Sequence, residues 1–171
     1  MIFLNYGPLY LRGVEPTDAD LLYDVENDVE AWPDSDIHAP YSREMLRSYA
    51  ESYRADPLTD GQLRMIAVDA ASSRTVGILD LYDISALHGH ACVGIYVLPD
   101  CRRHGFGRAM IEAAVDYARR RLGLHTLAAK ILADNAQSIR LFTAAGFRVA
   151  GTLPAWHFAD GRYHDVMLLA L

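Results

Sequence analysis

The chain has 171 residues, of which 51% are hydrophobic, and its formal net charge at pH 7 is −6. This length is enough for one soluble domain with a full hydrophobic core, so we expect residues 1–171 to form a single domain and exclude a second one. The negative charge argues against a nucleic-acid-binding surface and is compatible with an acidic pocket for a cationic substrate.

Neither membrane insertion nor secretion is expected. No run approaches the roughly 18 apolar residues that a transmembrane helix requires, and the N-terminal residues lack the basic region of a signal peptide. The cytoplasm is therefore the expected location. Cys92 and Cys101 have no Cys-x-x-Cys spacing, and we expect free thiols rather than a disulfide or a zinc site.

Two helices are predicted in the first third of the chain, at residues 17–28 and 42–55, each opened by a threonine or serine that can cap the first turn. The segment between them is interrupted by two prolines and is expected to be a loop. This loop contains more aromatic and acidic side chains than a connector needs, including Trp32 and Tyr41. It is therefore a candidate substrate-binding segment.

The remaining apolar runs predict strands and two further helices. The predicted strands are residues 9–14, 62–69, 75–84, 91–97, 125–133, 147–153 and 163–171. Helical patterns cover residues 107–122 and 135–145, and residues 154–162 are predicted to be a loop between the last two strands. This order of strands and helices is typical of one mixed α/β layer.

A glycine-rich segment follows the strand at residues 91–97 and opens the next helix. Its sequence is Arg102-Arg103-His104-Gly105-Phe106-Gly107-Arg108-Ala109. The two glycines allow a tight turn and close backbone approach, and the helix start offers unpaired N–H groups and the positive end of the helix dipole. Arginines beside that end are unfavourable by roughly 0.3–1 kcal/mol each unless an anion is bound. The segment therefore predicts a binding site for a phosphate-bearing ligand.

Two nucleotide-binding motifs are excluded for this segment. The Rossmann fingerprint requires a third glycine, whose place is taken by Met110, and a Walker loop requires Gly-Lys-Ser/Thr, whereas here Gly107 is followed by Arg108 and Ala109. The pattern Arg-x-x-Gly-x-Gly instead resembles the pyrophosphate loop of the Gcn5-related N-acetyltransferase (GNAT) family, which binds acetyl-coenzyme A.

A second stretch carries the same resemblance. It reads Asn135-x-x-Ser138-x-x-Leu141-Phe142-x-x-x-Gly146-Phe147 and is similar to the second signature of the GNAT family. The resemblance implies the acyl-CoA N-acyltransferase fold, an α/β fold whose central, mostly antiparallel mixed sheet contains one splayed pair of parallel strands. The chain most resembles the spermidine/polyamine N-acetyltransferases, on the stretches Leu11-Arg12-x-x-Glu15-x-x-Asp18 and Gly77-Ile78-Leu79-Asp80-Leu81-Tyr82-Asp83-Ile84.

The resemblance implies acetyl-CoA as the donor and assigns residues to it. In the family, coenzyme A lies in the gap between the splayed strands, which are here residues 95–97 and 125–133. The residues implied in cofactor binding are Ile95, Tyr96, Val97, Arg102, Arg103, His104, Gly105, Phe106, Gly107, Arg108, Asn135, Ser138 and Phe142. Asn135 is equally compatible with a plain N-cap of its helix.

The resemblance also implies an amine acceptor, and two carboxylates are candidates for the catalytic base. Glu26 and Asp80 could accept the proton of a cationic amine, directly or through water, and would attract its ammonium group; a solvated helix face and an ordinary strand position are the alternatives. Asp80 and Asp83 match acidic residues near the amine in those enzymes. Because three positions separate them, a regular strand would direct at most one into the cleft unless a bulge intervenes. With Trp32 and Tyr41, these are the candidate substrate-binding residues.

One position departs from the family pattern. The aromatic residue of the second signature is commonly a tyrosine that protonates the departing thiolate, and here it is Phe142, which has no proton to give. We expect Tyr96 or a water to act instead, or coenzyme A to leave as a thiolate, since free thiols have a pKa near ~8.5. A catalytically idle acyl-CoA-binding module is the alternative of a different class.

The predicted function is transfer of an acetyl group from acetyl-CoA to a small cationic amine such as spermidine. The N-terminal amine of a protein, as in ribosomal-protein acetylation, and an aminoglycoside are alternative acceptors. We expect no nucleic-acid or membrane partner and a homodimer or higher homo-oligomer, with the segment around Trp156 forming either a cleft wall or a dimer contact. We expect no metal, because His88-Gly89-His90 lacks a third ligand at a useful spacing.

Overall fold

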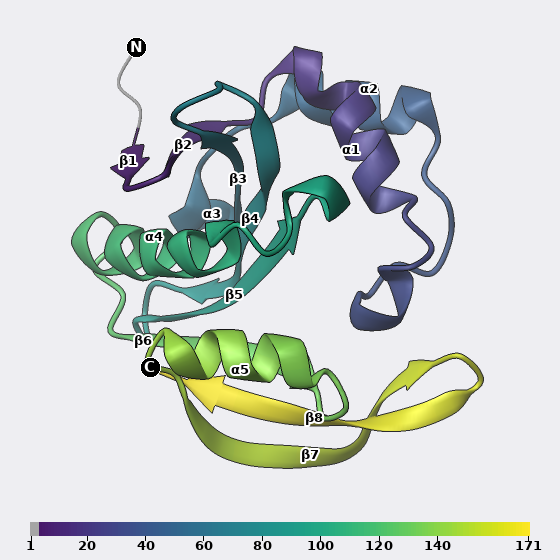
Figure 1. Ribbon diagram of the computed structural model, residues 1–171, viewed down its shortest axis with the longest axis vertical. Helices are drawn as coiled ribbons and strands as arrows, with labels where there is room; N and C mark the ends of the chain where they lie inside the picture. The colour runs from purple at the N-terminus through teal and green to yellow at the C-terminus, as the bar shows by residue number, and fades with distance from the viewer. Residues whose placement is uncertain (1–3) are drawn as a thin grey trace.

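The computed structural model describes residues 4–171, which form one eight-stranded sheet with helices packed against it (Figure 1). The strands lie in the order β1-β2-β3-β4-β5-β6-β8-β7. Their bounds are β1 Leu4–Tyr6, β2 Leu9–Gly13, β3 Leu63–Asp69, β4 Thr75–Ser85, β5 His90–Val97, β6 Thr126–Leu132, β7 Arg148–Ala159 and β8 Arg162–Ala170. Neighbouring strands are antiparallel except for β5 and β6, which are parallel. The predicted mixed, mostly antiparallel sheet is therefore confirmed.

The helices connect the strands and cover the sheet. The α-helices are α1 Ala19–Glu26, α2 Arg43–Ser52, α3 Pro57–Asp60, α4 Phe106–Arg120 and α5 Ala136–Ala144, and the 3-10 helices are η1 Pro16–Asp18, η2 Trp32–Asp34 and η3 Pro99–Cys101. The predicted caps at Ser42 and Asn135 are confirmed, because each side chain accepts the N–H of the residue three positions later. Within residues 4–171, no helix is long and apolar enough to cross a membrane.

Alternating side chains on the strands feed two separate hydrophobic clusters. In β4, Leu79 belongs to the large cluster that includes Met110 of α4 and Phe142 of α5. The next residue toward the N-terminus, Ile78, belongs to a smaller cluster that includes Leu22 of α1 and other side chains of α1 and α2. Strand alternation thus assigns one sheet face to α4 and α5 and the other to α1 and α2. Both cysteines are buried free thiols, as predicted.

The C-terminal hairpin differs from the prediction. Residues 154–162 were predicted to be a loop, but residues 154–159 belong to β7, Arg162 begins β8, and the strands are joined only by Asp160 and Gly161. Both of these residues have positive φ, 51° and 75°, which is the geometry of a two-residue hairpin turn with an Asp-Gly sequence. Pro154 does not end the strand because β7 is the edge of the sheet, where a missing N–H leaves no ladder partner unpaired.

The start of the chain also differs from the prediction. The predicted cap at Thr17 is wrong: the 3-10 turn η1 has Glu15 as its N-cap, in a capping box with Asp18, and α1 follows from Ala19. Arg12 also binds the Asp18 carboxylate. Two guanidinium nitrogens of Arg12 donate to it at 2.7 and 2.8 Å, and the N–H of Glu15 donates at 2.8 Å. The short elements β1 and α3 were not predicted, since three or four residues carry too little periodicity.

The parallel pair splays, as the resemblance implied. Pairing between β5 and β6 covers only His90 to Cys92 opposite Thr126 to Ala128. Beyond Cys92, β5 continues to Val97 and β6 continues to Leu132 without further pairing between them. The backbone groups that these strand ends turn toward each other are therefore open to a ligand.

Candidate functional site

One cavity brings together residues from most of the sheet. It is bounded by α1 and the segment after it, by β3 to β6, by the start of α4, by α5 and by the β7–β8 hairpin. Figure 1 shows the segment after α1 facing that hairpin. Most predicted site residues line the cavity: Glu26, Tyr41, Asp80, Asp83, Ile95, Tyr96, Val97, Arg102, Arg103, Gly105, Gly107, Arg108, Asn135, Ser138 and Phe142.

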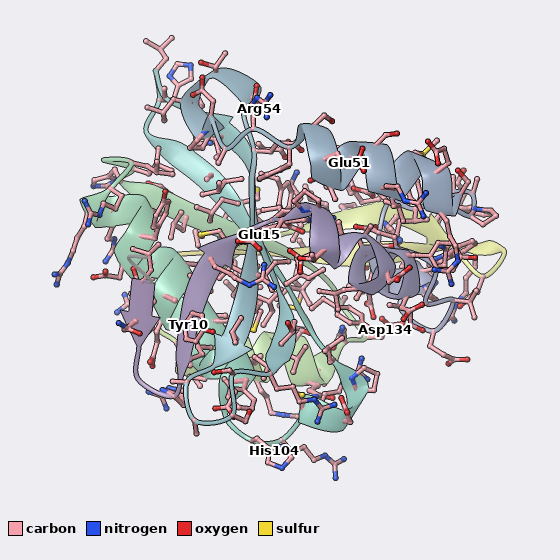
Figure 2. The ribbon with its side chains drawn as sticks, turned by 90° about the horizontal axis from the view of Figure 1, so that it is seen from above. Tyr10, Glu15, Glu51, Arg54, His104 and Asp134 are labelled. Atoms are coloured by element: carbon pink, nitrogen blue, oxygen red, sulfur yellow. The ribbon has the colours of Figure 1, made fainter. Side chains whose placement is uncertain are left out.

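Three predicted site residues are not among the described residues that line the cavity, namely Trp32, His104 and Phe106. The indole N–H of Trp32 instead donates to the backbone carbonyl of Glu26 at 3.0 Å and anchors the loop to the end of α1. His104 lies at the edge of the molecule (Figure 2), and Phe106 packs against the large core cluster. A direct role in binding stays a prediction for all three.

The start of α4 has the backbone geometry that an anion site requires. Gly105 is the N-cap, with φ at 83°, a left-handed conformation that glycine adopts without steric cost. The first hydrogen bond of the helix runs from the N–H of Ala109 to the carbonyl of Gly105, at 3.2 Å. The N–H groups of the three preceding helical residues therefore have no acceptor within the helix and remain available to a ligand.

Gly107 allows this helix start to approach its neighbours closely. A Cβ atom at Gly107 would lie 3.1 Å from Cδ2 of Leu141 in α5 and 3.6 Å from Cγ2 of Val97 in β5. The first distance is tighter than an ordinary van der Waals contact, so a side chain here would push α4 away from α5 or fill the cavity. Glycine at position 107 therefore leaves the backbone of the helix start accessible beside the end of β5.

The three arginines of this segment differ in what they contact. The Nε of Arg102 donates to the carbonyl of Val97 at 3.1 Å, and the Nε of Arg108 donates to Glu112 one helical turn on, at 2.8 Å. Arg103 has no hydrogen-bond or ion-pair partner among residues 4–171. Its guanidinium is therefore the one most available to an anion at the helix start.

Asn135 connects the cap of α5 with the acidic loop. Its Oδ1 accepts the N–H of Ser138 at 3.0 Å, and its Nδ2 donates to the carboxylate of Asp34 at 3.2 Å. Ser138 lines the cavity one turn into the helix. The cap role of Asn135 is confirmed, and contact with a cofactor stays a prediction for both residues.

Both candidate bases are bound by an arginine that no motif marks. Arg64 of β3 donates through Nε and Nη2 to the two carboxylate oxygens of Asp80, each at 2.8 Å, and through Nη1 to Glu26. The exposed fractions of the three side chains are 22% for Arg64, 30% for Asp80 and 14% for Glu26. The signal was a single arginine within the otherwise apolar strand Leu63–Asp69.

Arg64 stays charged in this setting. Burial lowers its pKa, but the hydrogen bonds to Asp80 and the negative charges of Asp80 and Glu26 outweigh that effect, so its pKa lies above the ordinary value. With one cation and two carboxylates, the cluster carries one net negative charge. It therefore presents a weakly anionic surface to the cavity, not two free carboxylates.

A β-bulge turns both Asp80 and Asp83 toward the cavity. The register between β4 and β5 shifts between Tyr82 and Ser85, and Asp83 has φ at 50°. Aspartate tolerates this left-handed conformation better than most residues. The bulge breaks the alternation that would otherwise direct the two side chains to opposite faces, and both line the cavity.

Tyr96 of β5 forms a short hydrogen bond across the cavity. Its hydroxyl donates to the carboxylate of Asp28, just after α1, at 2.5 Å. Burial, reinforced by the hydrogen bond to Asp28, raises the pKa of Tyr96 to about 12. The phenol therefore keeps its proton at neutral pH. Phe142, by contrast, is buried in the core and packs edge-on against Phe147, with ring centroids 5.1 Å apart.

Comparison with known sequences gives a family match over most of the chain. Residues 8–148 match the acetyltransferase (GNAT) domain. The spermidine N(1)-acetyltransferase of Vibrio cholerae is 28% identical over 161 residues, covering 92% of this chain and 89% of that protein. The [ribosomal protein bS18]-alanine N-acetyltransferase of Escherichia coli is 28% identical over 163 residues, covering 94% and 95% respectively.

Comparison with solved structures gives the same result. The crystal structure of the spermidine N-acetyltransferase from Vibrio cholerae, in complex with CoA and spermine, superposes with a TM-score of 0.87 at 25% sequence identity. The superposition covers 96% of this chain and 95% of that one. The shared fold therefore extends over nearly the whole molecule.

Proposed function

The chain belongs to the GNAT family of acetyltransferases, and we propose that it transfers the acetyl group of acetyl-CoA to a primary amine of a small polycation such as spermidine. The family match makes the chain an acetyltransferase with acetyl-CoA as its donor. The acceptor and the roles of individual residues are the proposed part.

The distribution of charge along the cavity carries this proposal. Cavity-lining residues at the start of α4 are cationic: Arg102, Arg103 and Arg108. The end formed by α1, the segment after it and β4 is anionic: Glu26, Asp28, Glu30, Asp34, Asp36, Asp80 and Asp83. The cations Arg64 and Lys130 near that end are paired with these carboxylates, Arg64 with Glu26 and Asp80 and Lys130 with Asp83. A phosphate-bearing donor and an ammonium-bearing acceptor are thus attracted to opposite ends.

The residues at the cationic end fit the donor. The free N–H groups after Gly105, together with the unpaired guanidinium of Arg103, would hold its pyrophosphate. Gly107 leaves room for this approach, and Asn135 and Ser138 would contact the pantetheine arm from α5. The bound donor supplies an acetyl thioester, which the open strand ends beyond Cys92 would position for attack.

At the anionic end, the sheet provides a path between acceptor and donor. The strand register places Arg64, Asp80 and Gly94 side by side on β3, β4 and β5. Gly94 lines the cavity without a side chain, and the Tyr82 ring lies beside it, 3.5 Å from the position that a Cβ atom would take. We assign Asp80 and Glu26 to attracting the ammonium group and receiving its proton through water, with Tyr41 and Asp83 as further substrate contacts.

Tyr96 is the proposed proton donor to the leaving thiolate. Phe142 cannot serve, whereas Tyr96 lies on the splayed strand, keeps its proton at neutral pH and already donates it to Asp28. A positioned general acid contributes about 10²- to 10⁴-fold to a rate, and a pKa above that of the leaving thiol places Tyr96 at the lower end of this range.

The N-terminal amine of a protein is the second candidate acceptor. The Escherichia coli alanine N-acetyltransferase and the Vibrio cholerae enzyme have the same sequence identity to this chain, 28%. A peptide α-amine carries one positive charge, and it would contact fewer carboxylates at the anionic end of the cavity than spermidine would. The two acceptors are therefore distinguished by whether turnover increases with the number of cationic groups on the amine.

The proposal is tested by thiol release from acetyl-CoA with a panel of amines. Spermidine, a monoamine of equal length, an alanine-terminated peptide and an aminoglycoside are compared at equal concentration. We expect the highest kcat/KM for spermidine, and we expect this preference to be lost at high salt, because salt screens the charges at the anionic end of the cavity. Highest kcat/KM for the peptide, or salt-independent turnover of the monoamine, would refute the polyamine assignment.

We also propose self-association through the edge of the sheet. Strand β7 pairs with β8 on one side and has no strand on its other side within residues 4–171, and the hairpin exposes Trp156, Phe158 and Tyr163 at 64%, 60% and 68%. An aromatic edge of this kind favours pairing with a second copy. Size-exclusion chromatography with light scattering tests it, and a monomer at micromolar concentration would contradict it.

A further inference from the structure

The chain contains a single lysine, Lys130. The other fifteen of its sixteen lysine and arginine residues are arginines, which have no primary amine. Lys130 lies on β6 and lines the cavity that holds the predicted donor and acceptor sites. The one side-chain primary amine of an amine acetyltransferase is thus located inside its own cavity.

The position of Lys130 on β6 directs its amine toward the splayed strand ends, where the acetyl thioester is proposed to lie. Lys130 is two residues beyond Ala128, the last residue of β6 paired with β5, so it lies on the splayed part of the strand. Residues 127, 129 and 131 belong to the core cluster, and strand alternation therefore places Lys130 on the opposite face. Asp80 and Tyr82 point from β4 to that same face.

The amine is held by groups that recognise a cation. Its Nζ donates to the carboxylate of Asp83 at 2.9 Å and lies 5.8 Å from the centre of the Tyr82 ring. A carboxylate and an aromatic face are the contacts that an acceptor ammonium would use. Lys130 therefore occupies a position suited to the acceptor, on a flexible four-carbon stem.

We propose that Lys130 is a site of self-acetylation. The nitrogen of Lys130 forms a bond to the acetyl carbon as the carbon–sulfur bond breaks, and the proton lost from nitrogen leaves with coenzyme A as its thiol. The products are Nε-acetyllysine and coenzyme A, and no further reactant is needed. This inference rests on the donor position given above, but not on the identity of the amine acceptor.

Acetylation of Lys130 would change the charge at the anionic end of the cavity. Neutralising Lys130 removes the partner of Asp83 and makes the anionic end more negative by one charge. A polycationic acceptor would then be attracted more strongly. Self-acetylation at low acceptor concentration is therefore expected to lower the KM for a polyamine without changing the cationic end.

The rate is expected to depend on pH through the lysine amine. The hydrogen bond to Asp83 raises the pKa of Lys130, and the charge of Asp36 acts in the same direction, with Tyr82 and the Cys92 thiol as the other nearby titratable groups. Only the neutral amine attacks, so below that pKa the rate increases about tenfold per pH unit. Asp83→Asn keeps a residue type that tolerates the left-handed backbone and should raise the rate several-fold at pH 7.5.

The experiment is to incubate the full chain with acetyl-CoA alone and follow its intact mass, followed by peptide mapping. We expect one acetyl group on Lys130, none at this position in Lys130→Arg, and a strongly reduced rate in Gly107→Trp. Lys130→Arg is the matched control because it keeps the charge and has no acetylatable amine. Urea-unfolded chain measures uncatalysed chemical acetylation.

The outcomes separate this inference from the proposed acceptor. An adduct on Lys130 without turnover of any amine would retain the inference and refute the polyamine assignment. Amine turnover without an adduct would refute the inference alone. An adduct that forms equally fast in unfolded chain or in Gly107→Trp would also overturn it, because the donor site would then have no part in the reaction.

Discussion

Removal of Arg64 is expected to destabilise the fold, because it leaves two carboxylates facing each other without a cation. In the native protein one guanidinium binds both oxygens of Asp80 and one oxygen of Glu26. Arg64→Met keeps an unbranched apolar stem and removes the guanidinium group with its charge and its donors. The effect therefore reports mainly on the ion pairs.

The magnitude follows from how buried the three groups are. Breaking a fully buried pair by deleting one partner costs about 3–5 kcal/mol, whereas an exposed pair contributes about 0–1 kcal/mol. The side chains are 14–30% exposed, nearer the buried limit. We therefore expect a loss of about 2–4 kcal/mol in the free energy of unfolding. For a chain of this length, that corresponds to a decrease in Tm of about 5–15 °C.

Urea unfolding at pH 7, followed by circular dichroism, measures this loss. The control combines Arg64→Met with Glu26→Gln and Asp80→Asn, which removes the repulsion as well as the attraction. Because the three residues interact directly, their effects should be non-additive, and the combined variant should be more stable than Arg64→Met alone. A loss under about 1 kcal/mol for Arg64→Met would refute the reasoning, as would a combined variant that is no more stable than the single one.

Three further predictions concern catalysis, donor binding and assembly. Tyr96→Phe should lower kcat by at least about 100-fold with an unchanged KM for acetyl-CoA. Since the pKa of Tyr96 is raised to about 12, the acid form of its phenol is lost only as pH rises through that value. The kcat of the wild-type protein should therefore not decline up to pH 10 through loss of this proton. Normal turnover of Tyr96→Phe would mean that water protonates the leaving thiolate. Gly107→Trp should raise the Kd for acetyl-CoA at least about tenfold in isothermal titration, since a loss of about 1.4 kcal/mol in binding free energy is enough for a tenfold change. An unchanged Kd would mean that the start of α4 is not part of the donor site. Phe158→Asp should halve the mass measured by light scattering, with an unchanged circular dichroism spectrum, and a mass equal to that of wild type would place any interface elsewhere.

The local geometry at the proposed donor end could be predicted because its determinants are local. The cap of α5 joins Asn135 to Ser138, and the start of α4 has Gly105 as its N-cap and Gly107 in its first turn. Such features leave a pattern in adjacent residues, whatever the rest of the chain does. The last hairpin carried a comparable signal in Asp160-Gly161, but Pro154, which indicates a break in a strand, concealed the continuation of β7.

The acceptor end could not be predicted in the same way, because it depends on contacts between distant residues. Arg64 lies 38 positions from Glu26 and 16 from Asp80, and only the register of β3 against β4 brings them together. Asp80 and Asp83 share the cavity because of a bulge, which strand periodicity does not encode. Lys130 and Asp28 were likewise unmarked by any motif.

The sequence alone therefore determined the order of the main elements, the family and the donor, since helix caps, glycine turns and apolar periodicity act over a few residues. The tertiary structure decided which carboxylates are paired, which tyrosine faces the cavity and where the single lysine lies. These depend on strand register, on the bulge at Asp83 and on the splay beyond Cys92. A shift of one residue in the register of a strand would turn the side chains of that strand to the opposite face of the sheet.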